Sequence, residues 1–477
     1  MVRFLTAAVV TCAAGAVSGA GYLFSVAVVP SFMGLVLLLL ATAGKGWRAR
    51  LFLGFLWGSF FFGITQEWIT AFNRPGYFCT VAYCSLYPAA ACWLQNNPLR
   101  PSSHARVWAM SWCGLAWAGV FYARGFLMSG FPSPGGLLSE IGAGAWLAPV
   151  IGQTGADLVA VSACCWMADT MARRQSKRMV GLAGLFVGGG IFLPCPAVPA
   201  SHQSVRILAV QAAKGRSLAY PVLKHLETAP AIVVWPECST EAIGPGMARS
   251  PEVDYMLGKG AMAVIYGVVS VAPIGGSEKI AMYAASSRTL AHHVKTKLIP
   301  FGEFNPLPSL PGIHRWINGE RSFEAVRGTE HRSLSCAGLK VIPLICYEDY
   351  FSSCIVECLR ADRADLIICA GNATDFAGTN EGRIHLISAK WRAMEAGLWM
   401  VRCYTGGITC LVSPSGATQV LPQDSSEMLD VLVPLRADPG TLYVRWGHHL
   451  GSIALLLTLC LPIGRILFTE KLRTRAG

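Results

Sequence analysis

The chain has 477 residues, of which 53% are hydrophobic and 14% are charged, and its mean hydropathy is +0.46. This composition is too apolar for an ordinary soluble enzyme, so we expect a membrane protein. A formal net charge of +12 would suit a nucleic-acid partner, but the basic residues lie in short loops between apolar segments, where they set membrane topology. We therefore predict no nucleic-acid binding.

Apolar segments long enough to cross a bilayer recur along the chain, since one crossing takes about 20 residues. We predict eight of them, at roughly 4–22, 27–43, 51–71, 77–94, 106–122, 148–168, 179–195 and 449–468. The first resembles a signal peptide, but a second follows almost at once and no small-residue cleavage site precedes it. We predict a membrane domain of seven helices over 1–195, and a C-terminal helix with a basic tail over 446–477.

The basic residues of the loops predict the orientation of these helices. Lys45, Arg48 and Arg50 fall in one loop, and a second basic run covers 173–178, whereas the alternate loops hold little beyond Arg74 and Arg124. Because cytoplasmic loops are enriched in Lys and Arg, both chain ends should be cytoplasmic. The region 196–445 should then lie outside, which for a bacterial inner membrane means the periplasm.

Residues 196–445 suffice for one domain of ordinary size. Apolar runs predict strands at 206–211, 231–235, 263–271, 280–285, 341–346, 366–370, 399–402 and 408–412. The segment 382–397 has an amphipathic helical pattern, and Ser413-Pro414-Ser415-Gly416 reads as a hairpin turn. Strands that alternate with helices indicate α/β layers.

Three of the apolar runs end in residues whose side chains could take part in catalysis. Cys346 closes the run 339–345, Glu237 follows Val234-Trp235-Pro236, and Lys295 lies eight residues before Glu303. A lone strand cysteine is most often a buried structural residue. Here, however, a base and a cation accompany the thiol. Since a free thiol has a pKa of about 8.5, Glu237 is the candidate to take its proton, and Lys295 to stabilise the oxyanion formed when a carbonyl is attacked.

These three segments resemble the Glu-Lys-Cys signature of the nitrilase superfamily. Lys295 to Glu303, with Leu298-Ile299-Pro300-Phe301-Gly302 between them, and Cys346-Tyr347-Glu348 are similar to its membrane branch, the apolipoprotein N-acyltransferases. The resemblance implies an αββα sandwich for the outer domain. It also implies that Glu303 assists catalysis, and that Tyr347 and Glu348 help to shape an oxyanion site beside the nucleophile.

The segment from Phe304 to Ser335 is long and rich in Pro and Gly, and we expect a loop without secondary structure of its own. It carries Trp316, Ile317 and Phe323. Beside an active site on a membrane protein, such a loop would act as a lid that enters the bilayer and admits a lipid tail. A passive surface loop is the alternative.

The chain also departs from the family pattern. The family usually carries a second asparagine and a tryptophan near Asn372, where this chain has Gly371 and Asp375. It often has Asn-Asn-Gly where this chain has Thr405-Gly406-Gly407. These positions lie in the substrate region, so the acceptor is less well defined by the resemblance than the nucleophile is.

Metal ligands are not indicated by spacing. The 17 cysteines include no paired C-x-x-C, and the ten histidines show no ligand pattern. We predict neither a metal nor a cofactor.

The resemblance implies a monomeric membrane acyltransferase. It would move a fatty acyl chain from a phospholipid through a Cys346 thioester to an amine, the N-terminal diacylglyceryl-cysteine of an apolipoprotein. Two other interpretations stay open. One keeps the triad in a membrane-tethered amidase or in a dedicated acyltransferase of a conjugal-transfer system. The other is a transporter or structural membrane protein with an inactive outer domain, against which a complete triad argues.

Overall fold

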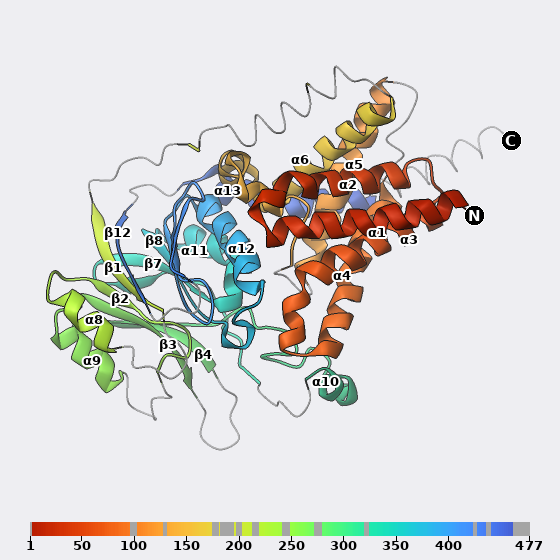
Figure 1. The fold of residues 1–477 in the computed structure, drawn as a ribbon. Coiled ribbons are helices and arrows are strands. Elements are labelled where there is room, and N and C mark those ends of the chain that lie inside the picture. Colours follow the sequence, from red (N-terminus) through yellow and green to blue (C-terminus); the bar gives the residue numbers. More distant parts are fainter. Residues whose placement is uncertain are drawn as a thin grey trace. The chain divides into compact units, whose positions relative to one another are not determined.

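The computed structural model describes residues 2–95, 103–126, 131–173, 181, 195–196, 203–211, 219–240, 249–270, 279–318, 324–422, 427–435 and 440–460. Two compact units make up the chain (Figure 1). The first comprises Met1–Glu67, Tyr77–Cys195 and Trp446–Gly477, and it is helical. The second comprises Trp68–Gly76 and Pro196–Arg445, and it contains the sheets.

Long apolar helices build the first unit. They are α1 (Val2–Leu23), α2 (Val28–Thr42), α3 (Trp47–Thr65), α4 (Arg74–Leu94), α5 (Ser103–Arg124) and α6 (Gly142–Ala172), with the short turns η1 (Ser25–Ala27), η3 (Gly136–Glu140) and η6 (Gly447–His449). Among the described residues, three segments are long and apolar enough to cross a membrane: Phe4–Leu23, Ser25–Thr42 and Gly142–Ala172. A shorter apolar helix covers Gly447–Cys460. Helices thus occur at seven of the predicted spans, while 179–195 lies almost wholly outside the described residues.

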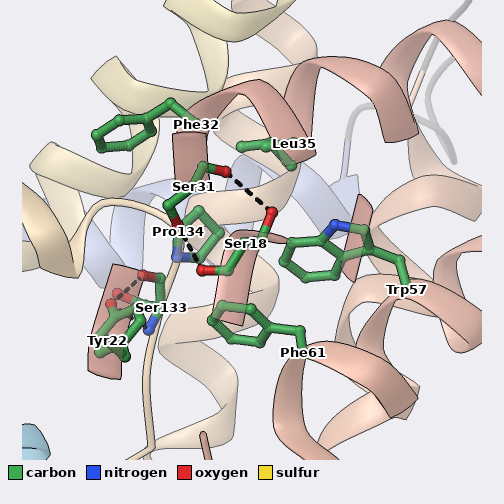
Figure 2. A pocket seen from close by; sticks show the side chains of 9 residues that line it. All are labelled: Ser18, Tyr22, Ser31, Phe32, Leu35, Trp57, Phe61, Ser133 and Pro134. Atoms are coloured by element: carbon green, nitrogen blue, oxygen red, sulfur yellow. Dashed lines mark hydrogen bonds between the residues drawn. The ribbon is translucent and has the colours of Figure 1, made fainter. Parts of the chain in front are cut away.

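Small residues allow close packing within this unit. Ser18 Oγ donates to the Ser31 carbonyl at 2.9 Å and Ser31 Oγ donates to the Ser18 carbonyl at 2.5 Å, which ties α1 to α2. A Cβ on Gly34 would lie 2.4 Å from the Ala14 carbonyl oxygen, so only glycine permits this approach. Figure 2 shows the small pocket beside this crossing. It is lined by Ser18, Tyr22, Ser31, Phe32, Leu35, Trp57, Phe61, Ser133 and Pro134.

Two six-stranded sheets form the second unit. One has the order β12-β1-β2-β3-β4-β5 and the other β11-β10-β9-β8-β7-β6. The strands are β1 (Ser204–Val210), β2 (Ile232–Val234), β3 (Ala263–Ser270), β4 (Lys279–Ser286), β5 (Leu290–Val294), β6 (Leu334–Cys336), β7 (Leu339–Ile345), β8 (Leu366–Asn372), β9 (Met400–Thr405), β10 (Cys410–Val412), β11 (Thr418–Val420) and β12 (Met428–Pro434). The inner pairs β1–β2, β2–β3, β7–β8 and β8–β9 are parallel, and the pairs toward the sheet edges are antiparallel.

Side chains alternate across each sheet, which produces three apolar layers. One lies between the sheets and includes Ile207 and Val234 from one sheet and Val341 and Ile368 from the other. The second packs α8 (Ala219–Leu226) and α9 (Pro251–Gly258) on the first sheet. The third packs α11 (Ser352–Ala361) and α12 (Glu381–Ala396) on the second sheet. This confirms the predicted αββα sandwich.

All eight strands expected from the apolar runs are present. The predicted helix over 382–397 is α12, which ends at Gly397 with φ +67°. The predicted hairpin joins β10 to β11, with Val412 paired to Thr418. The sequence analysis missed β5, β6, β11 and β12. Polar residues interrupt the apolar pattern in β5 (LAHHV), β6 (LSC), β11 (TQV) and β12 (MLDVLVP).

Candidate active site

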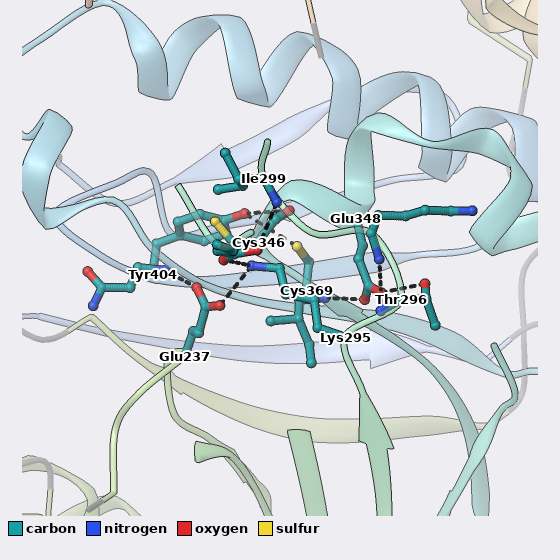
Figure 3. Close-up of polar contacts among 12 residues, drawn as sticks. Glu237, Lys295, Thr296, Ile299, Cys346, Glu348, Cys369 and Tyr404 are labelled. Atoms are coloured by element: carbon teal, nitrogen blue, oxygen red, sulfur yellow. Dashed lines mark hydrogen bonds and ion pairs between the residues drawn. The ribbon is translucent and has the colours of Figure 1, made fainter. Parts of the chain in front are cut away.

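The polar residues predicted from the strand ends meet at one place in the second unit (Figure 3). Glu237 follows β2 and Lys295 follows β5, both from the first sheet. Cys346 follows β7 and Asn372 ends β8, both from the second sheet. Each sheet therefore contributes two strand ends to a site that neither sheet forms alone.

Lys295 lies between two carboxylates. Its Nζ donates to Glu237 Oε1 at 3.0 Å and to Glu303 Oε1 at 2.6 Å, and its side chain is fully buried. Burial alone would lower the pKa of Lys295, but Glu237 and Glu303 raise it well above its usual value. Burial and the neighbouring Glu237 also raise the pKa of Glu303, against the opposing effect of Lys295. The lysine is therefore held as a cation.

Backbone amides hold the other oxygen of each carboxylate. Glu237 Oε2 accepts from the Asn372 amide at 3.0 Å, and Glu303 Oε2 accepts from the Ile299 amide at 2.9 Å. Gly267 on β3 lies directly against Glu237, because a Cβ there would be 2.5 Å from the Glu237 Cα. These contacts fix the carboxylates in place.

Cys346 begins the turn η4 (Cys346–Tyr350), and its φ is +47°. A non-glycine residue in the left-handed region costs of order 1–3 kcal/mol and persists only where its surroundings enforce it. Burial, reinforced by Glu237, raises the pKa of the Cys346 thiol well above its usual value, although Lys295 opposes this. The resting residue is therefore a thiol that needs a base in order to react.

Glu348 is completely buried and joins the ends of β5 and β7. Its carboxylate accepts from the Thr296 amide at 2.6 Å, the Thr296 hydroxyl at 2.8 Å and the Ile345 amide at 2.9 Å. Burial alone would raise its pKa, but His331, His293 and these hydrogen bonds hold it well below the usual range. Glu348 thus clamps the ends of two strands together, and its part in an oxyanion site stays a prediction. The Tyr347 ring packs against Tyr350 and Phe351, and its role stays a prediction.

His293, His331 and Glu348 form a buried group whose ligand atoms lie within 4.8 Å of one another. Hydrogen bonds account for this group without an ion. His331 Nε2 donates to the Pro343 carbonyl at 2.7 Å, its Nδ1 lies 3.1 Å from the Thr296 hydroxyl, and His293 Nε2 lies 3.1 Å from Glu348 Oε2. Residues from three separate segments meet here, which is why sequence spacing did not reveal the group.

The predicted lid has secondary structure, so the expectation of a bare loop over 304–335 is wrong. It contains α10 (Pro311–Asn318) and ends in β6. Trp316 is 59% exposed, whereas Ile317 is only 8% exposed and its Cγ2 would lie 3.6 Å from a Cβ on Gly76. Phe323 lies outside the described residues.

One part of this unit was missed from the sequence. Trp68 and Phe72 lie on the segment Trp68–Gly76, which belongs to the sheet unit. The predicted span 51–71 was therefore too long, because α3 ends at Thr65. The rings of Trp68 and Phe72 are 4.9 Å and 6.4 Å from the ring of Phe376, which follows Asn372 closely in the chain. The sequence analysis had no signal for this contact, because a tryptophan beside a membrane span is usually interfacial.

Comparisons with known proteins cover both units. The family model described as the apolipoprotein N-acyltransferase N-terminal domain matches residues 14–166. The apolipoprotein N-acyltransferase of Pseudomonas putida is 35% identical over 180 residues, which are 36% of this chain and 35% of that protein. The enzyme of that name from Chromobacterium violaceum is 27% identical over 425 residues, 83% of this chain and 80% of that protein. The one from Pseudomonas paraeruginosa is 24% identical over 504 residues, 93% of each.

Among solved structures, a CN-hydrolase superfamily protein from Xanthomonas campestris is 14% identical, with a TM-score of 0.35, and covers 53% of this chain and 97% of that one. An amidase from Nesterenkonia is 17% identical, with a TM-score of 0.35, and covers 53% of this chain and 95% of that one.

The αββα sandwich with a glutamate, a lysine and a cysteine at its strand ends is the arrangement that the resemblance to the nitrilase, or carbon–nitrogen hydrolase, superfamily implied. The family model that matches the helical unit and the relatives that match most of the chain all carry the name apolipoprotein N-acyltransferase. Over most of its length the chain is similar to the apolipoprotein N-acyltransferases.

Proposed function

We propose that this chain is a membrane N-acyltransferase that uses Glu237, Lys295 and Cys346 to move a fatty acyl chain from a phospholipid to the N-terminus of an apolipoprotein. The observation that carries the proposal is the fully buried Lys295 cation held between Glu237 and Glu303 beside the Cys346 thiol. A fixed cation, a fixed carboxylate and a strained cysteine are the components that acyl transfer through a thioester requires.

In the first half-reaction, Glu237 takes the Cys346 proton as Sγ attacks the carbonyl carbon of a phospholipid ester. Lys295 stabilises the tetrahedral oxyanion, since a preorganised buried charge acts strongly in a site that excludes water. The C–O bond then breaks, the leaving alkoxide takes the proton from Glu237, and a lysophospholipid departs. The product on the protein is a Cys346 thioester. Glu303 supports this step by accepting a second hydrogen bond from Lys295 Nζ.

In the second half-reaction, an amine attacks the thioester carbon. Glu237 takes a proton from the amine nitrogen, the C–S bond breaks, and the Cys346 thiolate receives that proton. The names of the relatives point to an apolipoprotein as the acceptor, and the α-amine of its diacylglyceryl-cysteine is the group that becomes an amide.

Both substrates are lipids, which is consistent with the apolar helices of the first unit. We assign the membrane domain to 1–195 and 446–477, the catalytic domain to 196–445 in the periplasm, and the whole protein, as a monomer, to a bacterial inner membrane. Exposed apolar side chains recur every third residue around α10, at Leu307, Leu310, Ile313 and Trp316. Such a surface suits contact with acyl chains, and it supports the assignment of this segment as the lid.

The experiment follows the acyl chain. Purified protein is mixed with a phospholipid that carries a labelled acyl chain, and protein and free fatty acid are measured separately. We expect a labelled thioester on Cys346, little fatty-acid release, and an N-acyl product once a diacylated lipopeptide with a free N-terminus is added. Cys346→Ala should form no thioester, while Cys238→Ala, which removes the thiol next to Glu237 in sequence, should still form it.

Rapid release of fatty acid without an amine would show a hydrolase and favour the amidase alternative. A stable thioester that ignores the lipopeptide would retain the acyl chemistry but exclude this acceptor. Labelling of any residue other than Cys346 would refute the assignment of the nucleophile.

A further inference from the structure

A second buried polar group lies behind the nucleophile, and the acyl-transfer steps above do not use it. Its centre is His385 on α12, which is 2% exposed. His385 Nδ1 lies 2.9 Å from Glu381 Oε1, and His385 Nε2 contacts Asp349 Oδ1. Asp349 belongs to η4, the turn that begins with Cys346.

The protonation state of His385 follows from this geometry. Each ring nitrogen faces a carboxylate, and only the imidazolium can donate from both nitrogens at once. Burial alone would lower the pKa of His385, but Asp349 and Glu381 raise it above its usual value. Among the described residues, the charged groups that face this network are Glu381 on α12, Asp349 on η4 and Arg402 on β9. The other titratable groups beside it are Tyr350, Tyr404, Cys369 and Cys346.

Further contacts hold η4 on this side. The Tyr350 ring stacks on the His385 ring with centroids 4.4 Å apart and an angle of 4° between planes. Arg402 Nε lies 3.4 Å from Asp349 Oδ2, and Arg392 Nη1 donates to the Tyr350 carbonyl at 2.9 Å. The turn that carries Cys346 is therefore held by α12 and by β9.

Tyr404 links this network to the nucleophile itself. Its hydroxyl lies 3.5 Å from the Cys346 carbonyl oxygen and 3.5 Å from His385 Nε2. The ring occupies space left by Gly371, where a Cβ would lie 2.2 Å from Tyr404 Cε1. Any side chain at position 371 would therefore displace the Tyr404 ring.

We propose that His385 and Tyr404 are positioning residues for acyl transfer. His385, charged between Asp349 and Glu381, fixes the turn η4, and Tyr404 holds the Cys346 carbonyl so that the strained residue presents its thiol to Glu237 and Lys295. The inference rests on the proposed function for its assay. The contacts themselves position Cys346 in the same way for any acyl donor.

The sign of the pH dependence follows from the charge. The network is complete below the raised pKa of His385 and weakens as pH rises through it, because a neutral imidazole leaves one carboxylate without a donor. The rate of thioester formation should therefore decrease as pH rises through the pKa of His385. We call this decrease the alkaline step, and it should be absent when His385 is replaced.

The test measures the rate of Cys346 thioester formation against pH. His385→Gln should slow it at least about tenfold at neutral pH, the effect of one hydrogen bond to a charged group, and should abolish the alkaline step. Tyr404→Phe should slow it about fivefold but keep the alkaline step, because His385 still lies between Asp349 and Glu381. The double variant should be no slower than His385→Gln.

Two matched controls should keep the wild-type rate and profile. His292→Gln changes an exposed histidine on β5. Tyr266→Phe removes a buried hydroxyl that has no hydrogen-bond partner among the described residues.

A wild-type rate in Tyr404→Phe, an alkaline step that persists in His385→Gln, or additive effects in the double variant would each overturn the inference. If His385→Gln does not fold, Tyr404→Phe carries the test alone, since it removes a single oxygen atom. If wild-type protein takes no acyl chain from phospholipid, the proposed function fails. The same variants are then compared by the rate of Cys346 alkylation with iodoacetamide, where the same order and the same loss of the alkaline step are expected, and equal rates would overturn the inference.

Discussion

Removal of the Lys295 cation tests the candidate site most directly. In the native protein Glu237 and Glu303 both accept hydrogen bonds from Lys295 Nζ. Lys295→Met keeps a side chain of similar length but removes this nitrogen, so the two carboxylates are left without the cation that they share. Breaking a buried ion pair from one side typically costs about 3–5 kcal/mol, because the remaining charge stays buried without a partner. Loss of one oxyanion donor slows acyl transfer by about 10²–10³-fold. We therefore expect a clear loss of stability together with a loss of thioester formation.

A second substitution separates these two effects. Lys295→Met combined with Glu303→Gln removes the repulsion between the carboxylates, so it should recover much of the lost stability but none of the activity. Thermal unfolding in detergent reports the first quantity, and mass spectrometry of the Cys346 thioester reports the second. Wild-type stability in the single variant, or thioester formation in the double variant, would refute the reasoning.

Three other predictions concern the nucleophile, the pH response and the topology. Cys346→Ser should form no acyl-enzyme detectable by mass spectrometry, because an alkoxide is far harder to form with a carboxylate base than a thiolate; turnover near wild type would contradict this. Burial lowers the pKa of His331 to about 4 from 6.5, so its contribution to the stability of the fold is complete above about pH 6.5 and is lost as pH falls toward 4. The pKa of Glu348 is held below its usual value of 4.5, so its contribution is complete above that value and is lost only at lower pH. The His331 contribution is about 3 kcal/mol, and the drop in melting temperature between pH 6.5 and 4 should be smaller in His331→Asn. A reporter active only in the periplasm should work when fused after residue 200 or 440 and fail after residue 175, and activity at 175 would overturn the assigned orientation.

The sequence by itself determined the parts of the protein that depend on local pattern. Short β-branched and aliphatic runs predicted the eight inner and neighbouring strands, because a buried strand needs such residues over a few consecutive positions. The same runs placed Glu237, Lys295 and Cys346 at strand ends, and strand ends meet at an edge of a sandwich. Glu303 lies close enough in the chain to Lys295 for its motif to be recognised.

Only the tertiary structure decided which partner each buried charge has. Glu348 lies 52 residues from Thr296, and its carboxylate accepts hydrogen bonds from the Thr296 amide and hydroxyl. The motif gave no sign of this contact. His385 and Asp349 are 36 residues apart, and Trp68 meets Phe376 across most of the chain. The periodicity of the sequence cannot predict such pairs, because the hydrogen-bond partner of a buried charge is set by how separate elements pack together.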